Sequence, residues 1–371
     1  MKIDSADQGS TVSSMHSGVP EGAQGKNPMS IAGRSRKAVK KLLFGNTLFP
    51  QKFFLGQPEP QTEVAVWLHG MDEPIDVTRR HSMACAVPLT ICIAFEEGQR
   101  PTAHQLNRLS LRFCERDGEQ RLIGEIGLRF TSVIFMKNSK LSLFEARSAT
   151  NHCLPKSKLW MHSLFHSYTQ WRNGGDSPDI KMSSVDKRAL AVMFFCPRPV
   201  SLVSAVDENG GNIFPVNVMG DLDNGYFAFG LKDSRLPAHL VERSGRIALS
   251  NVPLPQASIA YRLGVNHTKK FVDWYKLPFE TTPSTTFKIP VPVFALRVRE
   301  MQVESVHRIG SHTLFIARIV SDERIAHGVE MYVVHGFYQA WRVRNRRVEL
   351  SRSVAEDSLV KFGQPPDRLP S

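Results

Sequence analysis

Two segments far apart in the chain carry nearly the same strand sequence, and this repeat constrains the fold more than any other feature. The run LFEAR at 143–147 returns as LFIAR at 314–318, and an earlier run from 72 to 104 matches 207–239 without a gap. The offset between the halves grows along the chain, so the later half carries an extra block of about 36 residues. Because these matches keep the same order, they predict a tandem duplication rather than chance similarity between strand-rich segments.

Both halves are rich in short apolar runs that are typical of strands. Runs such as EVAVWLHG, LTICIAF, YFAFGL and RIALSNV are rich in Val, Ile, Phe and Thr and alternate with turn signals, which is typical of a barrel or sandwich. Helices are predicted at 100–109 and at 234–245, the second ending at Gly245, a usual C-cap residue. Residues 160–172 fit either a helix or a strand. The sequence therefore predicts a mainly β protein with few, short helices.

The positive charge of the chain lies mostly at its two ends. The net charge is +12, of which residues 1–55 and 342–371 supply the larger part. A nucleic-acid groove would need cations interleaved with base-stacking aromatics inside a domain, so we expect solvated basic tails and no specific nucleic-acid partner. Nucleic-acid binding through the tails themselves is the alternative. Residues 1–30 are rich in Ser, Gly and Gln, which predicts disorder.

The remaining composition argues for a cytoplasmic protein without a membrane or metal partner. No apolar run approaches the roughly 20 residues that span a bilayer, and the N-terminus lacks the apolar core of a secretory signal. The five cysteines are odd in number and form no C-x-x-C pair, which favours reduced thiols. His162 and His166 have i, i+4 spacing, but no Glu follows the first as zinc hydrolases require. We therefore expect no metal site.

The two halves differ where chemistry would be expected. The later half alone carries the polar segment 264–284, in which His267 and Lys269 lie close together. It also has His312 where the earlier half has Leu141. Polar insertions of this kind usually form surface loops that carry function. One copy is thus equipped for a ligand, and the other has the character of a scaffold.

Four segments of the later half together resemble the flavin reductase-like family, whose fold is the FMN-binding split barrel. They are CPRPVSLVSAVDENGGNIFPVNVM (196–219), LKDSRLPAHLVERSGRIALSNV (231–252), the polar loop from 264, and IGSHTLFIARIV (309–320). The last is similar to the family's Gly-Asp-His-Thr motif, with Ser311 in place of Asp. The resemblance implies two tandem split β-barrels of the six-stranded Greek-key type. It also implies FMN, or alternatively FAD, as cofactor and NADH or NADPH as cosubstrate.

The resemblance also implies which residues contact the ligands. The expected flavin-binding residues are Arg198, Pro199, Val200, Asn217, Lys232, Ser234, Arg235, His267 and Lys269, and His312 is the expected catalytic residue. The chemistry agrees at the helix start, because a flavin phosphate needs a cation and N–H donors. Each of these groups also has a plain structural interpretation. Lys232, Ser234 and Arg235 fit a charged loop with a helix cap, and Asn217 fits a turn-side amide. His267 and Lys269 fit a solvated loop, and His312 fits a half-exposed strand histidine.

These inferences give a domain plan and a function. We expect a disordered basic leader (1–57), a degenerate split barrel (58–173), a linker (174–187), a flavin reductase-like barrel (188–345) and a tail (346–371). The predicted function is NAD(P)H-dependent flavin reduction, with reduced flavin passed to a monooxygenase or another acceptor. The two barrels would pack as a pseudo-dimer within the chain, with a homodimer as a further option. The alternative is a flavin-binding or protein-interaction module without turnover.

Overall fold

The computed structural model describes residues 52–57, 63–96, 98–116, 119–136, 140–172, 182–222, 224–345 and 351–353. Contacts divide the chain into residues 1–46 and 47–371, and every described residue belongs to the second unit. Most of the predicted leader, linker and tail therefore lies outside the described residues.

The N-terminal half forms an antiparallel sheet that, among the described residues, has seven strands in the order β3-β2-β6-β7-β8-β5-β4. The strands are β2 (Val64–His69), β3 (Ile75–Asp76), β4 (His81–Ala86), β5 (Leu89–Phe95), β6 (Ser110–Glu115), β7 (Leu122–Phe135) and β8 (Lys140–Asn151). The predicted runs EVAVWLHG and LTICIAF are β2 and β5. Their apolar side chains, apart from the half-buried Trp67, are buried, many of them in a large cluster to which both halves contribute.

The C-terminal half repeats this sheet strand for strand, in the order β11-β10-β14-β17-β18-β13-β12 of its described residues. The strands are β10 (Ser201–Asp207), β11 (Gly210–Val216), β12 (Met219–Asp221), β13 (Tyr226–Lys232), β14 (Arg246–Asn251), β17 (Arg297–Ile309) and β18 (His312–Arg324). Matched in chain order, the two sheets have identical topology. The prediction of a mainly β chain with two split barrels is confirmed, with short edge strands bringing each described sheet to seven strands instead of six.

The repeat aligns Leu141 with His312, and the strand registers place both residues close to the turn of a long hairpin. Leu141 pairs with Ile134 beside the β7–β8 turn, and His312 pairs with Ile309 beside the β17–β18 turn. Because residues on one face of a strand alternate, both positions lie on the face that carries the contact between the halves.

Short helices fill the connections, most of them in the C-terminal half. They are α2 (Lys156–Arg172), α3 (Ser184–Met193), α4 (Leu236–Ser244), α5 (Ala257–Arg262) and α6 (Gly336–Arg344), with single 3-10 turns η1 (Gln105–Asn107), η2 (Leu254–Gln256), η3 (Leu263–Thr268) and η4 (Trp274–Lys276). The helix predicted at 234–245 is α4, which ends at Gly245 in the left-handed conformation with φ 61°. The helix predicted at 100–109 is only η1, because Thr102 and Gln105 close a tight turn on each other.

A third sheet joins the two ends of the described chain in the order β20-β1-β19-β9. It contains β1 (Lys52–Gln57), β9 (Arg198–Pro199), β19 (Glu330–His335) and β20 (Ser351–Ser353). This sheet includes residues that the expected domain plan placed in the leader and in the tail. The expected leader to residue 57 ends in β1, whose apolar Phe53, Phe54 and Leu55 are buried, and the expected tail contains β20.

The expected linker is also shorter than predicted. Residues 184–187 belong to α3, which packs against β8. Ser183 caps this helix by accepting a hydrogen bond from the Asp186 amide at 3.0 Å, and the Asp186 carboxylate accepts one from the Leu89 amide at 3.0 Å. The start of the helix is thus fixed to the N-terminal sheet.

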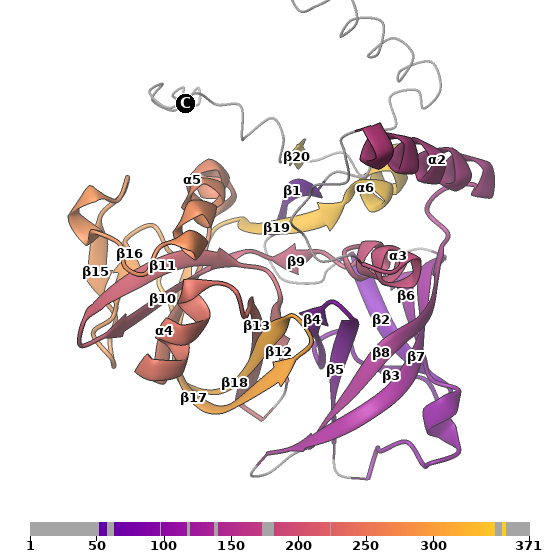
Figure 1. Ribbon diagram of the computed structural model, residues 1–371, viewed down its shortest axis with the longest axis horizontal. Helices are drawn as coiled ribbons and strands as arrows, with labels where there is room; N and C mark the ends of the chain where they lie inside the picture. The colour runs from indigo at the N-terminus through magenta and orange to yellow at the C-terminus, as the bar shows by residue number, and fades with distance from the viewer. Residues whose placement is uncertain are drawn as a thin grey trace, which may run out of the picture. The chain divides into compact units, whose positions relative to one another are not determined.

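The two sheets meet through β4 on one side and β12, β13 and β18 on the other (Figure 1). An apolar cluster spans this contact and includes Ala94 and Leu141 from the N-terminal sheet and Ala228, Leu314 and Ile316 from the C-terminal sheet. Burying apolar surface of this kind is the main stabilising contribution to such a contact. Within the described part of the chain, no helix has the length and apolar character needed to cross a membrane.

Candidate functional site

His312 lies at the start of β18 and is buried, with 4% of its surface exposed. Its Nδ1 lies 2.9 Å from the Ser311 hydroxyl and 3.6 Å from the Cys85 sulfur. Burial, and then the positive charge of Lys232, lower the pKa of His312 to about 4, against the opposing effect of Asp233. The imidazole is therefore neutral near pH 7, and its Nε2 has no hydrogen-bond partner among the described residues.

The surroundings of His312 come from both halves of the chain. Cys85 is the next-to-last residue of β4, and Val87 follows in the β4–β5 turn. The Ser311 amide donates to the Val87 carbonyl at 3.0 Å. Gly310 makes this approach possible, because a Cβ there would lie 2.4 Å from the Val87 oxygen and the residue has φ 54°. The N-terminal half thus holds the turn that carries His312.

Sequence reasoning missed Cys85, which is 227 residues from His312 along the chain. No local pattern around this cysteine distinguishes it from the other four, all of which are free thiols. The one available signal was Ser311, which replaces the usual Asp of the motif that the sequence resembles. Without that carboxylate, the imidazole contacts a hydroxyl and a thiol.

The turn from β13 into α4 carries two cations next to His312. Lys232 pairs with His312 across β13 and β18, and the Arg235 amide donates to the Lys232 carbonyl at 2.9 Å. Arg235 is the N-cap residue of α4, and its side chain makes no capping hydrogen bond. Ser234 is exposed beside it. A helix start with nearby cations is a suitable place for an anionic group.

The acidic residue of this turn is hydrogen-bonded to β18. The Asp233 carboxylate accepts a hydrogen bond from the Thr313 hydroxyl of β18. The Asp233 amide donates to the Ser311 carbonyl at 3.2 Å. Both bonds tie the turn to the strand that carries His312.

His267 lies in η3 and approaches the same helix start. Its Nε2 lies 2.9 Å from the Pro215 carbonyl of β11, and its ring lies 5.2 Å from that of Phe214. Burial lowers the pKa of His267, and the nearby Arg235 charge lowers it further. The packing of the neighbouring elements is consistent with this position of His267, because η3 contacts both α4 and β11.

The other two polar candidates lie on the same side but are less constrained. Lys269 is exposed, while its backbone carbonyl accepts a hydrogen bond from the Asn212 amide group at 2.8 Å. Asn217 follows β11 and is half-buried, and its side chain makes no hydrogen bond with the described residues. Lys232, Arg235, His267 and His312 are thus brought to one end of the C-terminal sheet, with Asn217 nearby along β11.

Arg198, Pro199 and Val200 do not join this group. Arg198 is buried, and its guanidinium donates to His81 Nε2 at 2.8 Å and to the Met193 carbonyl at 3.3 Å. Pro199 pairs with Tyr332 in the third sheet, and Val200 is part of the core. Their side chains take part in packing and in contact with the N-terminal half, and their binding of flavin stays a prediction.

The His81–Arg198 contact has a defined hydrogen-bond direction. The Val77 carbonyl lies 2.6 Å from His81 Nδ1 and can only accept, so Nδ1 carries the proton and Nε2 accepts from Arg198. Burial, and then the Arg198 charge, lower the pKa of His81 to about 3. The neutral His81 imidazole of the N-terminal half therefore accepts a hydrogen bond from the buried Arg198 guanidinium of the C-terminal half.

Comparison with known proteins supports the assignment of the C-terminal half. Residues 193–341 match the family model described as "Flavin reductase like domain". The search of curated proteins found no match.

Similar solved structures cover part of the chain. They include an FMN-binding protein from Thermus thermophilus with bound 1-cyclohex-2-enone (24% identity, 34% of this chain and 71% of that chain, TM-score 0.31). The NADH:FAD oxidoreductase SgcE6 of Streptomyces globisporus C-1027 has 16% identity over 43% of this chain and 95% of its own, with TM-score 0.37. The styrene monooxygenase flavin reductase of Pseudomonas putida S12 has 24% identity over 37% of this chain and 84% of its own, with TM-score 0.31.

The sheet topology, the residues gathered at the start of α4 and the family model all concern the same part of the chain. Residues 193–341 of this protein are a domain of the flavin reductase-like family.

Proposed function

We propose that the protein is an NAD(P)H-dependent flavin reductase whose C-terminal half binds one FMN, with FAD as the alternative. The observation that carries this proposal is the gathering of Lys232, Arg235, His267 and His312 where β13 ends and α4 begins. Two cations, a helix start and a neutral imidazole suit a ligand that combines a phosphate with a planar polar ring.

Lys232 and Arg235 would hold the flavin phosphate, with the exposed Ser234 hydroxyl as a further donor. Arg235 has no carboxylate partner among the described residues, so its guanidinium is available for a charge-assisted hydrogen bond. In the first turn of α4, Pro237 has no N–H and the Ala238 amide donates to the Arg235 carbonyl at 3.1 Å, so the Leu236 amide would be the backbone donor in this place. Asn217, His267 and Lys269 would border the ring and its side chain.

His312 would orient the reacting rings through Nε2. When flavin and nicotinamide are both bound, they supply the hydride chemistry themselves. The imidazole needs to stay neutral and fixed, so that it can hydrogen-bond a ring amide or carbonyl at the distance that hydride transfer requires. A pKa of about 4 keeps it neutral, and the contacts of Nδ1 with Ser311 and Cys85 limit its rotation.

The N-terminal half would act as a degenerate copy that binds no flavin and positions the site of the other half. It has Leu141 at the position of His312, and Glu96 follows the end of β5, where a carboxylate would repel a phosphate. Cys85 and Val87 would instead hold the Ser311–His312 turn. The two halves would then serve as a pseudo-dimer within one chain, and a homodimer of chains is a further possibility.

Reduced flavin would leave this site for a separate acceptor, such as a monooxygenase. The alternative function is a flavin-binding or protein-interaction module without turnover. It shares the binding residues and differs only in the absence of hydride transfer.

A flavin titration followed by anaerobic NADH and NADPH addition tests the proposal. We expect one FMN per full-length chain and bleaching of the flavin absorbance by at least one of the two nucleotides. Binding without bleaching would favour the alternative module. A protein that neither binds FMN nor reduces added FMN contradicts both the reductase and the flavin-binding module.

A further inference from the structure

A second concave site lies at the opposite end of α4 from the proposed flavin site. It is a pocket of about 370 Å³, and Ser244, the last residue of α4, lines it. Helix α4 has nine residues, and at 1.5 Å per residue it separates the two sites by roughly 13 Å. None of the residues expected to bind flavin lines this pocket.

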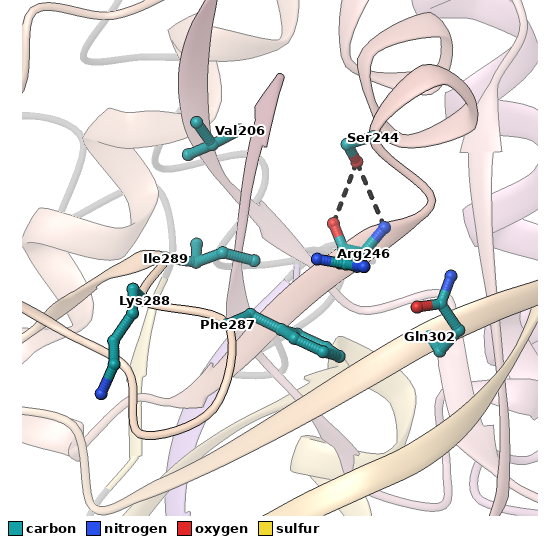
Figure 2. A pocket seen from close by; sticks show the side chains of 7 residues that line it. All are labelled: Val206, Ser244, Arg246, Phe287, Lys288, Ile289 and Gln302. Atoms are coloured by element: carbon teal, nitrogen blue, oxygen red, sulfur yellow. Dashed lines mark hydrogen bonds between the residues drawn. The ribbon is translucent and has the colours of Figure 1, made fainter. Parts of the chain in front are cut away.

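The pocket combines apolar walls with uncompensated positive charge. Val206 and Ile289 form one wall, and the lining includes Arg246 and Lys288 but no acidic residue (Figure 2). The guanidinium of Arg246 lies over the Phe287 ring, 5.2 Å from its centroid. Arg246 is exposed and has no carboxylate partner among the described residues. A guanidinium stacked on a ring keeps its edge N–H groups free for a planar anion.

A buried carboxylate fixes the wall that carries Phe287. Glu300 is 1% exposed and accepts hydrogen bonds from the Phe287 amide at 2.5 Å, the Thr286 amide at 2.7 Å and the Ser284 hydroxyl at 2.7 Å. The Ser284 hydroxyl in turn accepts from the Ile289 amide at 3.0 Å. A buried charge is tolerated only when it is satisfied in this way, so the loop is held in one conformation before any ligand arrives.

The carbonyl end of α4 does not oppose an anion here. Gly245 follows α4, and its carbonyl accepts from the Gln302 side chain at 2.7 Å and from the Val303 amide at 2.9 Å. These donors compensate the partial negative charge that a helix C-terminus would present. Lys288 donates to the Thr285 carbonyl at 2.8 Å, so Arg246 is the cation of the pocket whose hydrogen-bonding groups are available to a ligand.

We propose that this pocket binds a small organic carboxylate, independently of the flavin site. The carboxylate would take the edge N–H groups of Arg246, and the apolar body would lie against Val206 and Ile289. Phe287 and Ile289 lie in the connection between β14 and β17 (252–296), which is much longer than the corresponding connection between β6 and β7 (116–121). That region would thus serve two sites, with His267 facing the flavin and Phe287 facing the second ligand.

Benzoate and its uncharged analogue benzamide are suitable probes. The full-length chain is titrated with each by isothermal calorimetry, with and without FMN. We expect benzoate to bind about tenfold more tightly than benzamide, since a charge-assisted pair adds roughly that factor. Arg246→Gln should abolish the difference, and Phe287→Leu should reduce it.

Arg79→Gln is the matched control, because Arg79 is exposed on the N-terminal half and has no ion pair among the described residues. It should leave benzoate binding unchanged. The proposal would be overturned if benzoate and benzamide bound with equal affinity, or if both arginine variants lost benzoate affinity to the same extent. Inorganic phosphate that bound as tightly as benzoate would also overturn it. FMN affinity is read in the same variants, so failure of the flavin site and failure of this pocket are distinguished.

Discussion

At the turn between its two longest strands, the N-terminal half places Leu141 where the C-terminal half places His312. Both side chains are buried on the face between the halves. Leu141 packs within an apolar cluster, whereas His312 contacts the Ser311 hydroxyl and the Cys85 thiol. An apolar residue meets the packing requirement of this position in one copy, so packing alone gives no reason for an imidazole in the other.

The two copies also differ in how they use charge at the end of the neighbouring strand. Glu96, after β5, forms an ion pair with Arg80 of the same half. Arg235, after β13, has no such partner among the described residues. The charge of Glu96 is therefore neutralised within its own half, whereas Arg235 has no carboxylate partner in the part of the chain that the structure describes. Five predictions, which use four substitutions, test this contrast.

The largest expected effect comes from the contact that joins the halves. Replacing His81 by leucine removes the acceptor of the buried Arg198 guanidinium, and an unpaired buried charge costs about 3–5 kcal/mol. We expect that loss in the free energy of unfolding, measured by denaturant titration. His104→Leu is the control, because His104 is exposed. A loss below about 1 kcal/mol would mean that Arg198 is stabilised by other groups.

The next effect distinguishes the two copies by charge reversal. Arg235→Glu should weaken FMN binding about 100-fold, since it replaces a phosphate partner by a repelling carboxylate. Arg100→Glu is the matched control, because Arg100 falls opposite Arg235 in the repeat and is exposed. Fluorescence titration with FMN measures both. Equal weakening would place flavin binding in both halves or in neither.

His81 also predicts how stability depends on pH. Its pKa is about 3 in the folded protein, because of burial and the Arg198 charge, against an ordinary value of 6.5. Between these values the unfolded chain binds a proton that the folded chain does not, so stability is full above pH 6.5 and falls as the pH decreases. The contribution is about 2 kcal/mol between pH 6.5 and 5. The His81→Leu variant should lose that much less stability over the same range; an identical slope would contradict the assignment.

Converting His312 to the residue of the other copy tests its role in turnover. His312→Leu should lower the rate of NAD(P)H-dependent flavin reduction about tenfold, the value of one lost hydrogen bond in the site, with FMN affinity nearly unchanged. His307→Leu is the control, since His307 lies on β17 of the same hairpin and contacts Ser305. Unchanged turnover in His312→Leu would remove the imidazole from the mechanism.

The smallest effect concerns the partner of that imidazole. Ser311→Asp places a carboxylate beside Nδ1 and should raise the pKa of His312 by about one unit from its present value. Ser305→Asp beside the more exposed His307 should raise the pKa of that histidine less, because solvent screens the charge. Both are read by NMR titration of the imidazole protons. A pKa of His312 that does not move would show that Ser311 is turned away from the ring.

The sequence determined the elements whose causes are local. Apolar runs with turn signals at their ends gave the strands, and the C-cap position of Gly245 gave the end of α4, because strand burial and helix capping depend on neighbours within a few residues. The repeat predicted two sheets, whose shared strand order the fold confirmed. It also directed attention to Lys232, Arg235, His267 and His312, which the fold brings together.

Only the tertiary structure decided the contacts between distant residues. Cys85 and Val87 meet the Ser311–His312 turn from the other half of the chain, and no local pattern encodes such a contact. Arg198 fits a binding motif in the sequence, yet it is buried against His81, because the packing of the halves left no solvent at that position. The sequence thus specifies which groups exist, while packing of the two sheets decides which are exposed to a ligand and which hold the fold together.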